Sequence, residues 1–315
     1  MTSVSVIIPF HGDPAPTVRL VRALQAGHPA HLSEVIISDD CSPTPFPQTD
    51  GVMVVRRPEN GGFARAVNSG ASRATGDLLL VLNSDLALAP GFIDRLIARS
   101  AAWMPAVVTV PLKDPAGRTG HAGRHFPRTL HYVSEWLLPL ARLHHLRPVQ
   151  EAIGHDTLAD GSHDETADWV VGALMLVPRT AFLAVGGMDE RFYMNSEEVD
   201  LQRRLREIGV PSVVLGGEHA EHEGGGSSEP GHRAGWMLDG RRRYERKWRG
   251  RRGLLALESG MLSASCVNLV WNTFRAALGR QTSPVETART QYSLVRHPEQ
   301  WVPEQHRIDT SLWGG

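Results

Sequence analysis

Runs of apolar residues alternate with amphipathic segments along the first third of the chain. Runs of β-branched residues or leucine predict buried strands at residues 4–9, 34–38, 52–55, 78–83 and 107–110. Amphipathic or small-residue segments between them predict helices at residues 15–27, 62–75 and 91–103. Strands that alternate with helices are typical of a parallel sheet with right-handed crossovers, so the sequence predicts an α/β fold.

The remainder of the chain is less regular. Strands are expected at residues 168–178 and 213–215, and helices at residues 181–186 and 196–207. Residues 216–235 are rich in Gly, His and Ser and predict a mobile loop.

Two amphipathic segments stand out. One covers residues 130–146, and the other begins at Leu257, where apolar residues recur every three or four positions. The second segment follows Arg241–Arg252, which holds eight Arg or Lys and one Glu. A solvated helix face is the simple interpretation of these cations, but cations beside an apolar face are also typical of a helix at a membrane surface. Packing on the core and a homodimer interface stay open as alternatives.

Composition narrows the class of protein. The 315 residues are 41% hydrophobic and 21% charged, which is typical of a soluble globular protein with a sizeable core. The formal net charge of −1 gives no indication of nucleic acid as a partner. The two cysteines, Cys41 and Cys266, are too few for a disulfide framework and fit a reducing cytosol. Neither a signal peptide nor a membrane-spanning run is expected.

Polar side chains stand at the ends of two predicted strands. Asp39 and Asp40 follow the second strand, and Asn83 and Asp85 follow the fourth. In open parallel sheets, ligands bind at the carboxyl ends of the strands. An aspartate there suits a hard divalent cation, although a turn or cap role is the alternative for such a residue. The pattern therefore predicts a ligand site at this sheet edge.

Six blocks of sequence, in a fixed order along the chain, carry a resemblance to a known family. They are VSVIIPFHG, EVIISDDCS, NGGFARAVNSG, TGDLLLVLNSDLAL, WVVGALMLVPRTAFLAVGGMDERFYMNSEEVDLQRRLREIG and EHEGGGSS. Over about residues 3–248 the chain resembles the inverting family 2 glycosyltransferases, and most of all their bacterial rhamnosyltransferase-like branch.

This resemblance implies the GT-A fold, with a Rossmann-like, mostly parallel sheet and helices on both faces. It implies a glycosyltransferase domain at residues 1–248, in which residues 1–112 bind the nucleotide-sugar and residues 113–248 bind the acceptor. Residues 249–315 would then form a C-terminal helical extension, with a membrane-surface or oligomer contact as its expected role.

The resemblance also implies roles in binding the donor. Asp39 matches the acid that binds the pyrimidine base. Asn83-Ser84-Asp85 stands where the family has its DxD motif, so Asp85 becomes the direct metal ligand and Asn83 contacts ribose or a metal-bound water. Other positions that match the nucleotide-sugar site are Pro9, His11, Asn60, Gly61 and Asn68. At Gly61, a close backbone approach and free N–H groups at a helix start would favour phosphate. For Asp39 a turn role and for His11 an ordinary loop role are the alternatives.

The acidic pair in NSEEVDL matches the family's general base, which takes the proton of the acceptor hydroxyl. Alignment on VDL places Glu198 at the base position, with Glu197 as the alternative. Acids also stabilise a helix N-terminus, which is the purely structural interpretation of both. Asp200 and Arg204 lie four residues apart and predict a helix-surface or structural ion pair.

His222 matches the family's histidine that precedes glycines and serine, so it is assigned as a second ligand of Mg²⁺ or Mn²⁺, with a loop histidine as the alternative. Asp168 and Trp169 open the strand that lines the acceptor pocket in similar sequences. For Trp169, a stacking surface for a sugar and a core tryptophan are equally open.

The resemblance as a whole implies hexosyl transfer from dTDP-L-rhamnose, with a UDP-hexose as the second choice. The implied acceptor is a glycan, or a saccharide linked to polyprenyl diphosphate, in bacterial cell-envelope synthesis. We expect a cytoplasmic enzyme, or one peripheral on the inner face of the membrane. A nucleotidyltransferase is the rival, but the segment after the first strand lacks Lys or Arg before Arg19.

Overall fold

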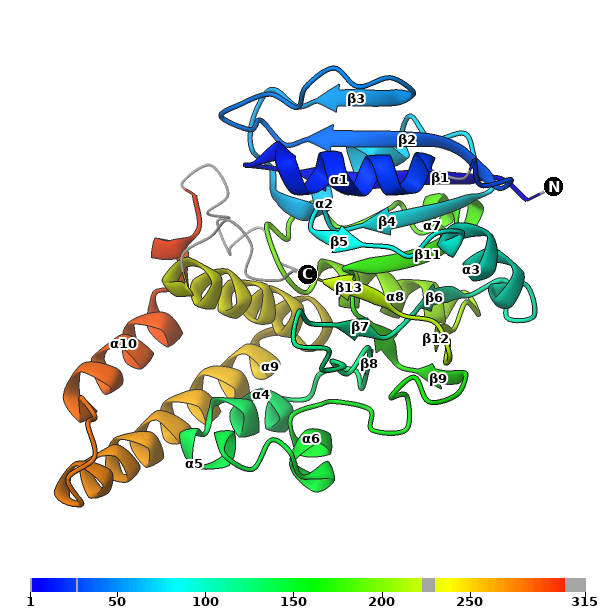
Figure 1. Ribbon diagram of the computed structural model, residues 1–315. Helices are drawn as coiled ribbons and strands as arrows, with labels where there is room; N and C mark the ends of the chain where they lie inside the picture. Colours follow the sequence, from blue (N-terminus) through cyan, green and yellow to red (C-terminus); the bar gives the residue numbers. More distant parts are fainter. Residues whose placement is uncertain (1, 27, 223–229, 304–315) are drawn as a thin grey trace. The chain divides into compact units, whose positions relative to one another are not determined.

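The computed structural model describes residues 2–26, 28–222 and 230–303 (Figure 1). The chain divides into two compact units. The sheet unit comprises Met1–Arg124, Leu158–Tyr193 and Glu197–Ser228, and the helical unit comprises His125–Thr157, Met194–Ser196 and Glu229–Gly315. The division into functional halves at residues 112 and 248 stays a prediction.

An eight-stranded sheet forms the centre of the sheet unit, in the order β3-β2-β1-β4-β11-β6-β12-β9. The strands are β1 (Val4–Phe10), β2 (Leu32–Asp39), β3 (Val52–Arg56), β4 (Leu78–Leu82), β6 (Val107–Thr109), β9 (Glu165–Ala167), β11 (Leu174–Pro178) and β12 (Ser212–Val214). The pairs β1–β2, β1–β4, β2–β3 and β6–β12 are parallel. The pairs that join β11 to β4, β11 to β6 and β12 to β9 are antiparallel. The α/β prediction is confirmed, with a mixed sheet in which parallel pairs predominate.

Helices cover both faces of this sheet, as expected (Figure 1). They are α1 (Pro14–Gln25), α2 (Gly62–Ala71), α3 (Phe92–Ser100), α7 (Arg179–Ala184) and α8 (Glu197–Glu207). Side chains alternate along each strand, so Val6 and Ile8 pack with α1 and α3, whereas Ile7 packs with α2, α7 and α8. A strand that is buried on both faces needs an unbroken apolar sequence, which explains the LLLVL of β4.

Two smaller sheets correct the prediction. Residues 168–178 do not form one strand, because β10 (Trp169–Val170) pairs with β8 (Gly123–Arg124) and the chain then turns before β11. The predicted loop at 216–235 contains β13 (Ala220–His222), which lies between β5 (Leu86–Ala87) and β7 (Leu112–Lys113), and Pro230 already begins α9. Residues 223–229 of that loop lie outside the described residues.

The helical unit is built around α9 (Pro230–Ala277), whose backbone is non-helical at Gly250, with φ 62° and ψ −155°. Its other helices are α4 (Thr129–Trp136), α5 (Leu138–Ala141), α6 (Arg147–Ala152), α10 (Pro284–Arg296) and the 3-10 helix η1 (Pro298–Trp301). The core of this unit joins α4, α9 and α10 through Tyr132, Leu238, Leu257, Met261, Leu294 and Val295.

The basic run on α9 is not simply a solvated face. Four of its arginines form ion pairs within the helical unit: Arg241 with Glu135, Arg242 with Glu258, Arg243 with Asp239, and Arg249 with Glu245. Arg251 and Arg252, at the end of the run, are exposed. Among the described interactions, neither of them forms an ion pair. Much of the run therefore serves the packing of α9.

Candidate functional site

The two predicted metal ligands meet in the sheet unit. Strand β13 pairs with β5, and this register places His222 opposite Leu86, the residue that follows Asp85. As a result, Nε2 of His222 lies 3.0 Å from Oδ1 of Asp85, although the two residues are 137 positions apart. Both side chains keep partial exposure, 29% for His222 and 22% for Asp85.

This pair fits the donor set of a hard divalent cation. Two adjacent ligand atoms in an octahedral shell with bonds of about 2.1 Å lie roughly 3 Å apart, which the Nε2 to Oδ1 separation matches. Carboxylate oxygen suits Mg²⁺ and Mn²⁺, and imidazole nitrogen is an accepted partner beside oxygens. In the structure the same two atoms are within hydrogen-bonding distance of each other.

The predicted base lies near the same strand end. The amide of Asn83 donates to the carbonyl of Ala173, 2.8 Å away, as β4 runs beside the start of β11. The neighbouring Gly172 faces Glu198, because a Cβ at Gly172 would lie 3.1 Å from Cβ of Glu198. Residues 172–173 thus connect Asn83-Ser84-Asp85 with Glu198. No sequence signal indicated this role for Gly172.

The start of α8 distinguishes the two glutamates. Asn195 and Ser196 precede the helix with φ values of 69° and 71°, a left-handed conformation that is uncommon outside glycine and concentrates at functional sites. Glu197 is 3% exposed and therefore buried, whereas Glu198 is partly exposed. Burial makes Glu197 the poorer group for meeting an acceptor hydroxyl, which favours Glu198.

One glutamine holds the predicted acceptor strand beside α8. Gln202 is fully buried; its Oε1 accepts from the amide of Val170 and its Nε2 donates to the carbonyl of Val170. The same Nε2 donates to the carbonyl of Glu198, 3.1 Å away. Sequence reasoning missed Gln202, which resembles an ordinary helix residue until its partners are visible.

The predicted acceptor residues have partners in the sheet unit. The Trp169 ring lies 5.9 Å from the Arg124 guanidinium, opposite it in the β10–β8 pair, and Asp168 forms a 3.4 Å ion pair with Arg206. Asp200 and Arg204 form the predicted structural ion pair. Acceptor binding by Asp168 and Trp169 stays a prediction.

Asp39 is completely buried at the end of β2, and donors of its own chain surround it. Its carboxylate accepts from the amides of Ser42 and Phe46 and from the Arg56 guanidinium. Burial alone would raise its pKa, but these hydrogen bonds outweigh burial and bring the pKa below its ordinary value. The carboxylate is therefore ionised and orders the loop at residues 42–46, and its base-binding role stays a prediction.

Asp40 occupies the helix start that was expected to hold phosphate. Its carboxylate accepts from the amides of Gly61 and Gly62, at 2.9 and 2.7 Å, and from Nε of Arg57. The reasoning that these amides are free is thus wrong in this structure. A phosphate role for Gly61 stays a prediction and requires its amide to exchange partners.

The other predicted donor residues hold neighbouring segments. Oδ1 of Asn60 accepts from the Tyr193 hydroxyl, whose pKa is raised to about 12 by burial and by nearby Asp40. Asn68 bonds both the amide and the carbonyl of Met188. Pro9 lies within β1, and His11 follows that strand as an exposed residue. Their contact with a donor stays a prediction.

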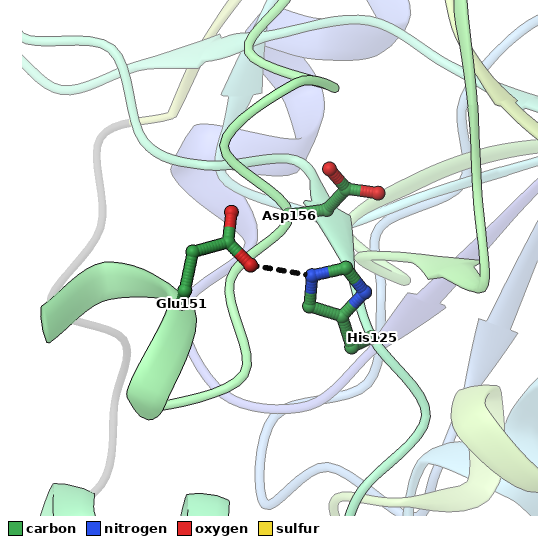
Figure 2. A group of neighbouring side chains, drawn as sticks. All are labelled: His125, Glu151 and Asp156. Carbon is green, nitrogen blue, oxygen red and sulfur yellow. Dashed lines mark hydrogen bonds and ion pairs between the residues drawn. The ribbon is translucent and has the colours of Figure 1, made fainter. Parts of the chain in front are cut away.

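A second histidine–carboxylate group lies in the helical unit (Figure 2). Nε2 of His125 lies 2.7 Å from Oε2 of Glu151, and Asp156 brings a third potential ligand atom within 4.8 Å of both. Oε1 of Glu151 accepts from the amide and hydroxyl of Thr157. Sequence reasoning missed this group, because its residues are spread over 32 positions without a motif.

Comparison with known proteins identifies a family domain in the first half of the chain. The model of Glycosyl transferase family 2 matches residues 5–159. N-acetylglucosaminyl-diphospho-decaprenol L-rhamnosyltransferase of Mycobacterium tuberculosis is 28% identical over 244 residues, which cover 68% of this chain and 74% of that protein.

Two solved structures share the fold. The structure of GalNAc-T7 with UDP, GalNAc and Mn²⁺ aligns over 93% of this chain and about half, 54%, of its own, with a TM-score of 0.54 at 14% identity. The structure of S. aureus TarS 1-349 aligns over 95% of this chain and 92% of its own, with a TM-score of 0.50 at 12% identity. The predicted GT-A-like fold is confirmed, and the chain is a glycosyltransferase that carries a Glycosyl transferase family 2 domain.

Proposed function

We propose that this enzyme is a divalent-cation-dependent, inverting glycosyltransferase whose donor site lies at the carboxyl end of β4. The observation that carries the proposal is the contact of Asp85 with His222, at 3.0 Å. Asn83, two residues before Asp85, bonds to Ala173, and the neighbouring Gly172 faces Glu198. Asp85 and His222 would hold Mg²⁺ or Mn²⁺, which supplies positive charge to the leaving diphosphate when bound. Asn83 and Ser84 would lie against the donor in the same segment.

The chemistry assigned to Glu198 is general base catalysis. The acceptor hydroxyl oxygen forms a bond to the anomeric carbon of the donor sugar, and its proton passes to the Glu198 carboxylate. The bond from that carbon to the diphosphate breaks, and its electron pair leaves with the nucleoside diphosphate. Attack opposite the leaving group inverts the anomeric configuration. Gly172 and Gln202 keep the start of α8 in place for this step.

For the donor we propose dTDP-L-rhamnose, with a UDP-hexose as the second choice. Support comes from the M. tuberculosis relative, whose name states rhamnosyl transfer to a diphospho-decaprenol-linked sugar. By the same relation, the proposed acceptor is a saccharide that is linked to polyprenyl diphosphate. Asp39 would contact the base only as a minor contribution, because donors of its own chain already bind its carboxylate. Trp169 offers a ring for stacking against an acceptor sugar.

The test is release of nucleoside diphosphate from each donor in the presence of a short-chain polyprenyl-diphosphate sugar and Mn²⁺. We expect dTDP to form from dTDP-L-rhamnose together with a rhamnosylated acceptor of inverted configuration. Release of pyrophosphate from a nucleoside triphosphate would instead support the nucleotidyltransferase alternative. Formation of UDP and a hexosylated acceptor would keep the site and change the donor.

The His125 group offers a second location for the cation, and variants separate the two. Asp85→Asn should abolish the dependence of transfer on Mn²⁺, whereas Glu151→Gln should leave it intact. The opposite result would move the catalytic cation to the helical unit and remove the main support for the site at β4.

A further inference from the structure

The second half of α9 carries an exposed apolar face. Val270, Phe274 and Leu278 recur every four residues and are 71%, 55% and 64% exposed, and Val267 is 50% exposed. From residue 259 to residue 274 the chain contains no Asp, Glu, Lys or Arg. Apolar residues so exposed and so close together mark an interaction surface rather than ordinary surface scatter. We name Val267, Val270, Phe274 and Leu278, which directly follows the helix, the α9 face.

The opposite side of α9 is held inside the helical unit by polar contacts. Oγ of Ser265 accepts from the Trp136 indole at 2.9 Å. Asn268 is fully buried, accepts from the amide of Leu138 and donates to the carbonyl of Trp136. By length and composition α9 includes a stretch that could cross a bilayer, but 33% of that stretch is buried. These contacts hold one side against α4 and α5, so only the other side is available to a partner.

The charge around the α9 face is positive. Arg251 and Arg252 are exposed at the start of this half of the helix, and Arg280 is exposed just beyond its end. Helix α10 packs along α9, and its exposed residues include Val285, Tyr292, Arg289 and the acid Glu286. Glu258, in contrast, is paired with Arg242 and Arg296. An apolar strip with arginines at its ends is the composition of helices that lie in the interface of anionic bilayers.

We propose that the α9 face docks the protein onto an anionic lipid bilayer, with the helix lying in the plane of the headgroups. The apolar side chains enter the acyl boundary, and the flanking arginines meet lipid phosphates. Charge complementarity selects a bilayer over a second copy of the chain, because two copies would bring their positive ends together around the same face. The proposal does not depend on the donor or acceptor assigned above.

Vesicle flotation of the full chain tests this proposal. The probes are vesicles of phosphatidylcholine alone and of phosphatidylcholine with phosphatidylglycerol, each at low and high salt. We expect flotation with the anionic vesicles, weaker flotation at high salt, and little with the neutral ones. The double variant Val270→Glu/Phe274→Glu should bind the anionic vesicles about tenfold more weakly or worse, because two apolar side chains leave the boundary.

The matched control is Leu183→Glu/Ile208→Glu, which places the same charges at apolar positions of the sheet unit that are 50% and 52% exposed. This control should float like the unaltered chain, and circular dichroism should show unchanged helix content in both variants. The proposal is overturned if the unaltered chain does not float with anionic vesicles. It is also overturned if the α9 variant and the control variant float equally. A dimer in light scattering that only the α9 variant breaks, without vesicle binding, would assign the face to a second copy and likewise overturn it.

Discussion

The ends of β2 and β4 both carry acidic residues, but the two strand ends use them differently. Asp39 at the end of β2 is fully buried, and its carboxylate accepts from two backbone amides and from Arg56. Asp85 beyond β4 stays 22% exposed and lies beside His222, a histidine brought in by another strand. The first acid organises its own loop, whereas the second belongs to an accessible pair with the chemistry of a cation site.

A carboxylate at a strand end is therefore not by itself a ligand site. Whether such a carboxylate can bind a ligand depends on whether donors of the same chain already form hydrogen bonds with it. At β2 the following residues turn back and supply amides, and at β4 the neighbouring β13 supplies an imidazole.

Replacing the predicted base should have the largest effect. Glu198→Gln removes the proton acceptor, so kcat should fall by about 10²–10⁴-fold while the Kd of the donor stays nearly unchanged. Single-turnover kinetics and calorimetry measure the two quantities. Glu197→Gln is the paired variant; a larger loss there than in Glu198→Gln would transfer the base role to Glu197.

Removing the charge beyond β4 should come next. Asp85→Asn leaves an amide oxygen but no negative charge, so kcat/KM should fall by about 10²-fold and raising the Mn²⁺ concentration should not restore it. A titration of rate against Mn²⁺ concentration makes the comparison. Full activity of Asp85→Asn at ordinary Mn²⁺ would show that the β4 end is no more a cation site than the β2 end.

A methyl group at residue 172 tests the positioning of Glu198. In Gly172→Ala the new Cβ would lie 3.1 Å from Cβ of Glu198, closer than side chains comfortably pack. The carboxylate should shift by a few tenths of an ångström, and kcat should fall about tenfold with little change in donor affinity. Equal losses in kcat and thermal stability would indicate a general packing defect instead.

The smallest catalytic effect is expected at β2, where the main change should be in stability. Asp39→Asn weakens its hydrogen bonds to Arg56 and the loop amides and should lower the free energy of unfolding by about 1–3 kcal/mol at pH 7. The folded-state pKa of Asp39 lies below its ordinary value of 3.8. The ionised carboxylate therefore stabilises the folded protein fully at pH values above 3.8. This stabilisation is lost as pH falls through the folded pKa.

Urea denaturation from pH 7 to pH 3 checks this sign. The difference between the unaltered chain and Asp39→Asn should shrink on acidification. A difference that grows towards pH 3 would show that the carboxylate is not held ionised by its donors. A drop in kcat/KM as large as that of Asp85→Asn would remove the contrast between the two strand ends.

The sequence predicted the strands and helices from local patterns, which were strong in the first third of the chain. The apolar run of β4 predicted a strand clearly, because a strand buried on both faces must be apolar throughout. The helical spacing of apolar residues predicted α1. The prediction of one strand at residues 168–178 was wrong. A turn at Gly172 interrupts this apolar run, and no strong local signal marks the turn.

Long-range partners explain the rest. The pairing of β13 with β5 could not be deduced from three residues inside a glycine-rich segment, but the resemblance had already joined Asp85 with His222. The partners of Asp40 were missed because its own carboxylate competes with a ligand phosphate for the amides of Gly61 and Gly62. Local sequence shows which groups are present, and only the fold shows which of them are already satisfied.

The most direct test of the donor site is calorimetric binding of dTDP with and without Mn²⁺, to the unaltered chain and to Asp85→Asn. We expect Mn²⁺ to tighten dTDP binding about tenfold or more in the unaltered chain and to have no such effect in Asp85→Asn. The same tightening in both proteins, or none in either, would contradict a cation site formed by Asp85 and His222.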